Sequence, residues 1–412
     1  MPLPAFGRSP TSGLNSGHVT AHFFMRIGDY MDLVYEKKYI RALCAVKGLN
    51  GRMGKEIIDH MGSASNVFSS DLKTLSELLT PGIVKGIVSA GSLIDSVLPE
   101  NMNFTTVYED EYPKRLREIP GAPLGIWHIG ALPAEDLPSV AIIGARQCSP
   151  YGEHVAKALG EYLGKAGVQV VSGMARGIDG ISQKAALENG GTSFGVLGSG
   201  ADVCYPPSNK MLYEKLKQSG GIISEYPPGE KALPANFPPR NRIVSGLSDA
   251  VVVVEARQKS GTLITVDTAL EQGREIYAVP GRVTDRLSDG CNSLIGQGAN
   301  VFLSPEIFIC ELMEIFESKA SNRTKRIPAC TFSPGTNKRH KSFSGKTPLP
   351  AGLSPDEENL LSLLSLSPMT TDELCLKIPG SDYPAISMAL MQLLIDGHVK
   401  QVSQGAFVRT YK

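Results

Sequence analysis

The chain has 412 residues and lacks several features that would place it in a simple class. Its 41 Lys and Arg residues balance 41 Asp and Glu residues, which excludes a strongly basic tail protein but not a local phosphate-binding patch. Its seven cysteines are widely spaced without a C-x-x-C pair, so we expect neither a disulfide framework nor a zinc ribbon. No apolar run approaches the ~18 residues of a membrane span, and no secretory signal is visible. These absences predict a soluble cytoplasmic protein with no membrane partner.

Catalytic and metal-binding patterns are also missing. The sequence contains no H-E-x-x-H, no G-x-S-x-G and no Asp/Glu cluster with metal-ligand spacing. Gly345-Lys346-Thr347 ends like a P-loop, but position 340 is His rather than Gly and no strand precedes it. We therefore expect no catalytic residues, no metal and no cofactor.

Composition and periodicity divide the chain into five parts. The segment before the core is predicted to be all-helical, with two glycine turns, at 47–54 and 79–84, that resemble helix-hairpin-helix turns. Such turns can direct backbone amides at a DNA phosphate, but they also occur where two short helices simply pack together. The segment after the core holds eight basic and no acidic residues, which predicts a disordered linker. The predicted parts are a disordered leader (1–26), a helical domain (27–100), a core (101–318), a basic linker (319–350) and a C-terminal domain (351–412).

The core alternates short apolar runs with helical patterns. Ala250 to Glu255 is the most strand-like run, and a helical pattern from Tyr151 to Lys165 follows the first strand. Continuous apolar strands separated by helices are typical of a parallel sheet covered on both faces. The sequence thus predicts an α/β, Rossmann-like core. The predicted strands lie at 139–143, 168–171, 192–197, 222–225, 250–255, 275–279 and 300–302.

The C-terminal domain has the element order of a winged helix. Ser354-Pro355-Asp356-Glu357 is a capping box that starts a first helix. Further helices are predicted from Thr370 to Leu376 and from Tyr383 to Ile395, followed by a hairpin at 399–402 and 407–409. The third helix, which would read DNA in such a fold, contains no Lys or Arg. We therefore favour protein docking or packing over base reading for this domain.

Four glycine-rich turns follow strands of the core. Glycine lets backbone amides approach an anion, and loops at the carboxyl ends of parallel strands share one crevice. One such turn is weak evidence because turns need glycine anyway, but four of them predict a phosphate-binding crevice. The candidate residues are Gly144, Ala145, Arg146, Ser172, Gly173, Arg176, Gly198, Ser199, Gly200, Lys259, Ser260, Gly261 and Thr262.

The most informative segment is Phe237-Pro238-Pro239-Arg240-Asn241-Arg242. Arginine forks can grip phosphate, and Asn241 can bond a base or ribose edge. The alternative is that the two arginines bond to loop carbonyls or to Glu225. Phe237, together with Tyr205 and Tyr226 in neighbouring loops, offers a stacking face for unpaired bases, although each ring could equally belong to the core.

In this order, the motifs resemble those of the DprA/Smf family of DNA-processing proteins. The similarity spans about 105–310 and rests on six motifs, which are Ile142 to Gly152, Ser172 to Asp179, Val196 to Asp202, Phe237 to Ile243, Ser260 to Thr265 and Val279 to Gly281. The resemblance implies a SAM-like helical domain, a winged helix and no catalytic reaction. It also implies binding of single-stranded DNA, protection of incoming strands during natural transformation, loading of the RecA recombinase, and a homodimer formed through the Rossmann domain. By motif, Gly144, Arg146 and the Arg240-Asn241-Arg242 group would line the DNA pocket.

Two positions depart from the family pattern. Ala145 stands where Ser or Thr is more usual, which could remove one hydroxyl contact to phosphate. Ser182-Gln183 stands where the family often has Ala-His, so a role for that histidine does not carry over.

Two other functions remain open at this stage. The enzyme alternative is a nucleoside-monophosphate phosphoribohydrolase-like Rossmann protein, whose P-G-G-x-G-T-x-x-E motif partly resembles Ser260 to Thr265. The catalytic Glu of that motif would fall at position 265, which is Thr, and this counts against hydrolysis. A nucleotide sensor or interaction scaffold is the other alternative.

Overall fold

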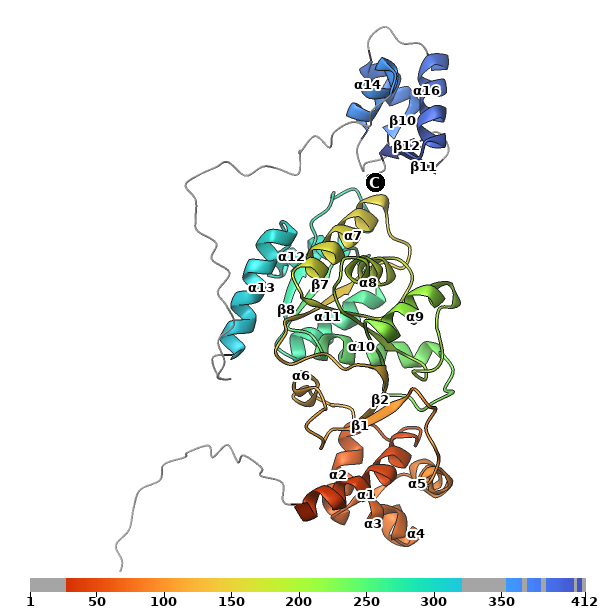
Figure 1. The fold of residues 1–412 in the computed structure, drawn as a ribbon, viewed down its shortest axis with the longest axis vertical. Helices are drawn as coiled ribbons and strands as arrows, with labels where there is room; N and C mark the ends of the chain where they lie inside the picture. Colours follow the sequence, from red (N-terminus) through yellow and green to blue (C-terminus); the bar gives the residue numbers. More distant parts are fainter. Residues whose placement is uncertain (1–26, 321–352, 365–368, 379–382, 404–405, 410–412) are drawn as a thin grey trace, which may run out of the picture.

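The computed structural model describes residues 27–320, 353–364, 369–378, 383–403 and 406–409. The predicted leader (1–26) and nearly all of the predicted basic linker (319–350) lie outside the described residues. Figure 1 shows an N-terminal helical unit, a central α/β core and a small C-terminal unit. Within the described residues, none of the helices is long and apolar enough to cross a membrane. In the same residues, no group of three or more His, Cys, Asp or Glu side chains could hold a metal ion.

The N-terminal unit is helical, as predicted. Asn50 caps α2 by accepting the Met53 N–H, and Thr80 precedes α5, so each predicted glycine turn leads into a helix. A side chain at Gly51 would collide with the carbonyl of Ala122 in the core. The first turn therefore packs against the core, a contact that the sequence did not predict. The helices are α1 (Ile27–Cys44), α2 (Gly51–Met61), α3 (Ala64–Ser69), α4 (Leu72–Leu78), α5 (Pro81–Ala90) and η1 (Gly91–Leu93).

The core is built on a sheet whose strand order, within residues 27–320, is β1-β2-β6-β5-β4-β3-β7-β8-β9. All the strands numbered β3 to β9 run parallel to their neighbours in this group, as predicted. Their bounds agree with those of the predicted strands to within two residues at each end. The other two strands were not predicted, and they extend the sheet in antiparallel fashion. The strands are β1 (Asn103–Thr106), β2 (Gly125–Gly130), β3 (Ser139–Ile143), β4 (Gln169–Ser172), β5 (Ser193–Leu197), β6 (Gly220–Ser224), β7 (Ala250–Val253), β8 (Glu275–Ala278) and β9 (Asn300–Val301).

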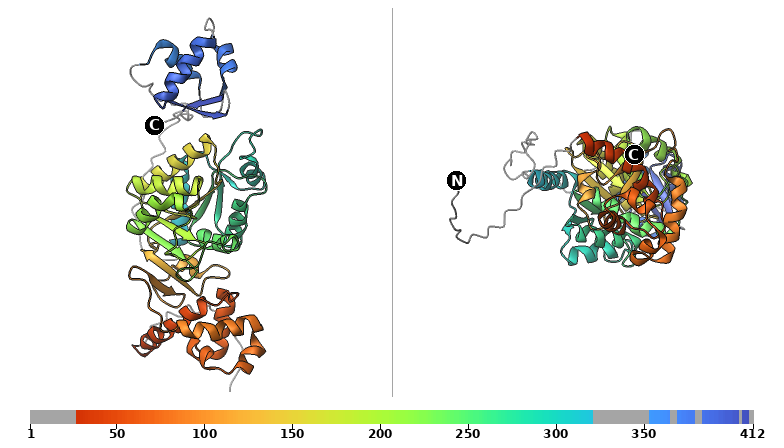
Figure 2. Two further views of the ribbon diagram at one scale, coloured as in Figure 1. Left: turned by 90° about the vertical axis from the view of Figure 1, so that its right-hand side faces the viewer. Right: turned by 90° about the horizontal axis from the view of Figure 1, so that it is seen from below.

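Helices cover both faces of this sheet. On one face, apolar side chains of α7, α8 and α13 pack on β3, β4 and β7. On the other, α10, α11 and α12 pack on the opposite side of the same strands (Figure 2). This two-faced burial explains why β7 is apolar throughout and why β3 is apolar after Ser139. The helices of the core are α6 (Lys114–Arg117), α7 (Pro150–Lys165), α8 (Ile178–Glu188), η2 (Pro207–Asn209), α9 (Lys210–Gln218), η3 (Pro234–Asn236), α10 (Phe237–Gly246), α11 (Gly261–Glu271), α12 (Asp289–Gly296) and α13 (Pro305–Ala320).

The C-terminal unit has the predicted winged-helix order. The capping box is present, with the Ser354 side chain accepting the Glu357 N–H and the Glu357 side chain accepting the Ser354 N–H. A short strand that was not predicted, β10, pairs with β12. The elements are α14 (Pro355–Leu363), β10 (Met369–Thr370), α15 (Thr371–Lys377), α16 (Tyr383–Ile395), β11 (Val399–Ser403) and β12 (Ala406–Arg409).

Candidate nucleic-acid interface

The topology brings four loops to one place at the carboxyl edge of the sheet. From β3 the chain moves to β4, β5 and β6 on one side, and then returns to form β7 on the other side of β3. In an open α/β sheet, such a reversal of strand order leaves a crevice outside the carboxyl ends of the strands. The loops that follow β3, β4, β5 and β7 all contribute to this crevice.

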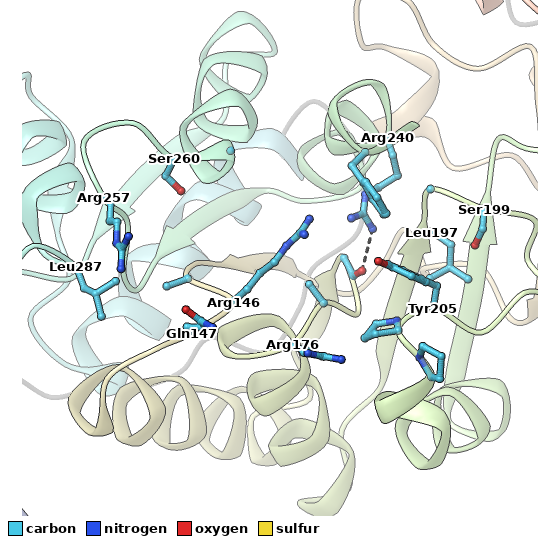
Figure 3. Close-up of a pocket in the computed structure, with 18 of the residues that line it drawn as sticks. Arg146, Gln147, Arg176, Leu197, Ser199, Tyr205, Arg240, Arg257, Ser260 and Leu287 are labelled. Carbon is cyan, nitrogen blue, oxygen red and sulfur yellow. Dashed lines mark hydrogen bonds between the residues drawn. The ribbon is translucent and has the colours of Figure 1, made fainter. Parts of the chain in front are cut away.

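The crevice holds two adjoining cavities of about 620 and 500 Å³, which we together call the cleft. They share Arg146, Phe237 and Arg240, and Figure 3 shows the larger one with arginines from several loops around it. The predicted residues that line the cleft are Gly144, Ala145, Arg146, Gly173, Arg176, Gly198, Ser199, Phe237, Arg240, Asn241, Lys259, Ser260, Gly261 and Thr262.

Three predicted residues do not line either cavity of the cleft. The Ser172 hydroxyl is buried and donates a hydrogen bond to the carbonyl of Ile142, 2.6 Å away. Gly200 lies against the backbone of Pro227, under the loop that follows β6. Arg242 lines a different cavity.

Four cations of the cleft have no acidic partner. Arg146, Arg176, Arg257 and Lys259 are exposed, and none of them makes an ion pair or a hydrogen bond with the part of the chain that the structure describes. No Asp or Glu is among the described residues that line the larger cavity. Like charges gathered in a concave, partly apolar site focus a positive potential. The cleft is therefore suited to an anion that carries several charges.

Phe237 is the aromatic centre of the cleft. The guanidinium carbons of Arg146 and Arg240 lie 5.4 and 5.9 Å from its ring centroid, and the ring of Tyr205 lies 5.7 Å away at 34°. Phe237 is half-buried and Tyr205 is exposed. These distances are within the range of cation–π and aromatic contacts. The cleft thus combines free cations with accessible aromatic faces.

Arg240 is part of the wall and is not a free cation. Its guanidinium donates to the carbonyl oxygen of Gly173 at 2.9 Å and to that of Val196. Burial lowers the pKa of Arg240 to about 10, and the charge of Asp179 opposes this shift. Burial in turn raises the pKa of Asp179, whose carboxylate accepts the Gly173 N–H at 3.1 Å. Arg240 and Asp179 therefore fix the loop that follows β4 beneath the cleft.

Arg242 lies on the opposite side of α10 and is paired with Glu225. Its Nη2 is 2.6 Å from both carboxylate oxygens of Glu225. The predicted role of Arg242 beside Arg240 in one pocket is thus corrected, because α10 begins at Phe237 and residues two apart on a helix lie about 200° apart around its axis. Both parts of the alternative interpretation occur, with Arg240 on loop carbonyls and Arg242 on Glu225.

A buried carboxylate ties the first and fourth loops together. Glu255 follows β7, and its side chain accepts hydrogen bonds from the backbone N–H of Ser149 at 2.9 Å and from the Ser149 hydroxyl. Ser149 is also the N-cap of α7, where its hydroxyl oxygen accepts the Gly152 N–H. This link holds the loop of Arg146 beside the loop of Arg257 and Lys259.

The two departures from the family pattern have different positions. Ala145 lines both cavities, so a hydroxyl there would face the cleft. Gln183 is fully buried in α8, and its amide donates to the Phe194 carbonyl at 3.0 Å and to the Ser193 hydroxyl at 3.1 Å. Gln183 therefore joins α8 to β5 in the core and does not line the cleft.

Some residues of the cleft were not predicted as site residues. Arg257 and Gln147 are exposed and line the larger cavity. Arg257 could have been found, because it is a basic residue in the same strand-to-helix loop as Lys259. Leu287 comes from the long loop after β8, and no motif marks it.

Comparisons with known proteins agree with this architecture. A family model described as DNA recombination-mediator protein A matches residues 103–313, and one described as DprA winged helix domain matches residues 344–405. Protein Smf of Synechocystis is 32% identical over 386 residues, covering 89% of this chain and 97% of that protein. DNA processing protein DprA of Streptococcus pneumoniae is 42% identical over 206 residues, covering 50% of this chain and 73% of that protein.

A solved structure gives the same result. The X-ray structure of DNA processing protein A from Streptococcus pneumoniae superposes with a TM-score of 0.59 at 33% identity, covering 66% of this chain and 97% of that one. The chain therefore belongs to the DNA recombination-mediator protein A (DprA/Smf) family of DNA-processing proteins.

Proposed function

We propose that this protein is a recombination mediator that binds single-stranded DNA, without sequence preference, in the cleft. The observation that carries the proposal is a group of four free cations that line the same cavity as the aromatic ring of Phe237, namely Arg146, Arg176, Arg257 and Lys259. Cations neutralise backbone phosphates, and an aromatic face stacks on a base whatever its identity.

The arrangement favours single strands over duplex. Bases of a duplex are paired and stacked on one another, so they do not offer a free face to Phe237 or Tyr205. A single strand can turn one base onto these rings while its phosphates contact the surrounding cations. The N-terminus of α11, at Ser260 and Gly261, adds backbone amides and a positive helix end to the same wall.

Family membership supports the finer parts of the proposal. We infer that the protein protects incoming strands during natural transformation, loads the RecA recombinase onto them, and acts as a homodimer through its core. A nuclease-protection assay, recombinase filament assembly on coated single strands, and sedimentation of the purified protein test these three points separately. A monomer at all concentrations would contradict the dimer without affecting the cleft.

The primary test is fluorescence anisotropy of labelled oligo-dT and of a duplex of equal length. We expect tighter binding of oligo-dT, weakened by salt, and a large loss of affinity in a variant carrying Arg146→Gln and Lys259→Gln. Lys165→Gln is the matched control, because Lys165 is an exposed cation in the last turn of α7, at the far end from the cleft. Equal affinity for both DNA forms, or an unchanged affinity in the double variant, would contradict the proposal.

The site does not favour the phosphoribohydrolase alternative. Thr265 is buried at the wall of the smaller cavity and supplies no carboxylate. The carboxylate at that wall, Asp179, is already held by the Gly173 N–H. Incubation with nucleoside monophosphates should release no free base, and release of base would overturn the non-catalytic role.

A further inference from the structure

The larger cavity of the cleft runs across the carboxyl edge of the sheet. Its lining follows the strand order β5-β4-β3-β7, with Leu197 at the end of β5, Arg146 after β3 and Arg257 after β7. Figure 3 shows Tyr205 toward one end, Arg257 toward the other, and Arg146 between them. Neighbouring strands lie about 4.8 Å apart, so the distance from β5 to β7 is about 14 Å. A single strand in the cleft therefore crosses the strands of the sheet, and one of its two exits lies beside Arg257.

The next strand in this order is β8, and the loop that follows it stands at the Arg257 end of the cleft. We call residues 279–288 the β8 loop. Leu287 of this loop lines the larger cavity. The Ala256 N–H donates to the Leu287 carbonyl, and the Gly290 N–H donates to the Ala256 carbonyl, both at 2.8 Å. These bonds hold the β8 loop next to Arg257, so a strand that leaves the cleft at this end passes along the loop.

The β8 loop is closed at its base. The Asn292 side chain accepts the Gly281 N–H at 3.2 Å and donates to the Gly281 carbonyl at 3.1 Å. The two ends of the loop are also in contact, because a side chain at position 281 would collide with the Ser288 hydroxyl. Groups that are already held in place lose little freedom when they bind a partner. The exposed residues of the β8 loop are therefore well placed to form a binding surface.

Two arginines of the β8 loop are free. Arg282 and Arg286 are exposed, and neither guanidinium makes an ion pair or a hydrogen bond with the described residues. Asp285 lies between them, but it is half-buried and its carboxylate accepts the Leu287 N–H at 3.1 Å. Asp289 lies in the first turn of α12, where the positive helix end offsets its charge. The groups that the loop presents to solvent are therefore mainly positive.

We propose that Arg282 and Arg286 form a second contact for single-stranded DNA, which extends the cleft on its β8 side. The two guanidinium groups bind phosphates of the nucleotides that leave the cleft beside Arg257. Free arginines suit this task, because they form charge-assisted hydrogen bonds with phosphate and release counterions from the strand. This inference rests on the proposed DNA binding by the cleft. It adds a direction, because the bound strand continues past β8 and not past β6.

The test compares a short with a long strand in salt titrations of the full chain. Single-strand sites hold about 4–16 nucleotides, so oligo-dT of about 4 nucleotides occupies the cleft alone and oligo-dT of about 16 reaches beyond it. For wild type, the slope of log K against log salt should be steeper by about 1.4 for the long strand, because two more phosphates are neutralised. A variant carrying Arg282→Gln and Arg286→Gln should lose this difference and bind the short strand as wild type does.

The matched control makes the same change of charge at the opposite end of the cleft. Lys210 and Lys231 are exposed and free of ion pairs with the described residues, at the start of α9 and in the loop after β6. A variant carrying Lys210→Gln and Lys231→Gln should keep the difference in slope between the two lengths. Arg146→Gln, within the cleft, should lower the slope for both lengths equally.

The outcomes separate this inference from the proposed function. If neither strand binds, both fail. If both strands bind but the Arg282 and Arg286 variant keeps the wild-type slopes, the cleft binds DNA and the β8 loop does not. If the Lys210 and Lys231 variant alone loses the difference, the strand leaves past β6 and the inference is overturned. Binding of the short strand shows in each variant that the cleft is folded.

Discussion

The strongest prediction concerns how salt weakens DNA binding when single cations of the cleft are removed. Arg146, Arg176, Arg257 and Lys259 are free of ion pairs with the described residues, so each can release one counterion from a bound strand. For single strands the slope of log K against log salt is about −0.7 for each neutralised phosphate, so four contacts give about −2.8. Raising salt from 50 to 200 mM should then weaken wild-type binding about 50-fold.

Arg146→Gln should reduce the slope to about −2.1, so that the same rise in salt weakens binding only about 20-fold. Arg242→Gln is the contrasting variant, because Arg242 already pairs with Glu225 at 2.6 Å and lies outside the cleft. It should leave the slope unchanged, although it should lower stability by leaving Glu225 without its partner. Anisotropy of labelled oligo-dT at several salt concentrations measures both slopes. The reasoning would be refuted if Arg242→Gln lowered the slope and Arg146→Gln did not.

Three further changes test other parts of the molecule. Phe237→Leu should weaken oligo-dT binding by about 1–3 kcal/mol through lost stacking, and should have little effect on an abasic strand, as anisotropy can measure. Gly173→Ala should lower stability by about 1–3 kcal/mol in a urea melt, because its new methyl carbon would lie 2.7–2.8 Å from Arg240 and Asp179. An unchanged urea midpoint would show that Arg240 and Asp179 can move away from the new methyl group without a loss of stability. Burial lowers the pKa of His128, so its contribution to stability is present above pH ~6.5 and is lost as pH falls through the folded-state pKa. The difference in unfolding free energy between wild type and His128→Gln should therefore shrink toward acid, by at most about 1.4 kcal/mol per pH unit.

The parallel part of the sheet could be predicted from sequence because burial on both faces makes the central residues of its longer strands apolar. Val251, Val252 and Val253 are all fully buried, for example, so no polar residue interrupts β7. The antiparallel strands β1 and β2 have no such pattern. β2 pairs with β6, which lies about 95 residues later in the chain, and local sequence carries no signal for a contact at that distance.

The residues that line the cleft could be predicted from sequence where they lie in loops that follow strands. They were harder to predict in α10, where the helix sets the direction of each side chain. Arg240 and Arg242 are close in sequence, but α10 directs their side chains to opposite sides. This happens because α10 begins at Phe237, so that both arginines lie within the helix. Two prolines follow Phe237, and a proline near a helix start is a signal that could have fixed the phase. Arg257 was not predicted because it lies two residues before the glycine-rich turn, which begins at Lys259.

The pairing of β3 with β7 also determines when the molecule can fold. Val140 pairs with Ala250 and Ile143 with Val253, so the partners are about 110 residues apart in the chain. At a synthesis rate of about 5–20 residues per second, the edge of β3 that pairs with β7 lacks its partner strand for roughly 5 to 20 seconds on the ribosome. The cleft uses loops from both strands and forms only after that edge closes. Any fragment that ends before residue 250 leaves the edge of β3 that pairs with β7 unpaired, and will aggregate more readily than the whole chain.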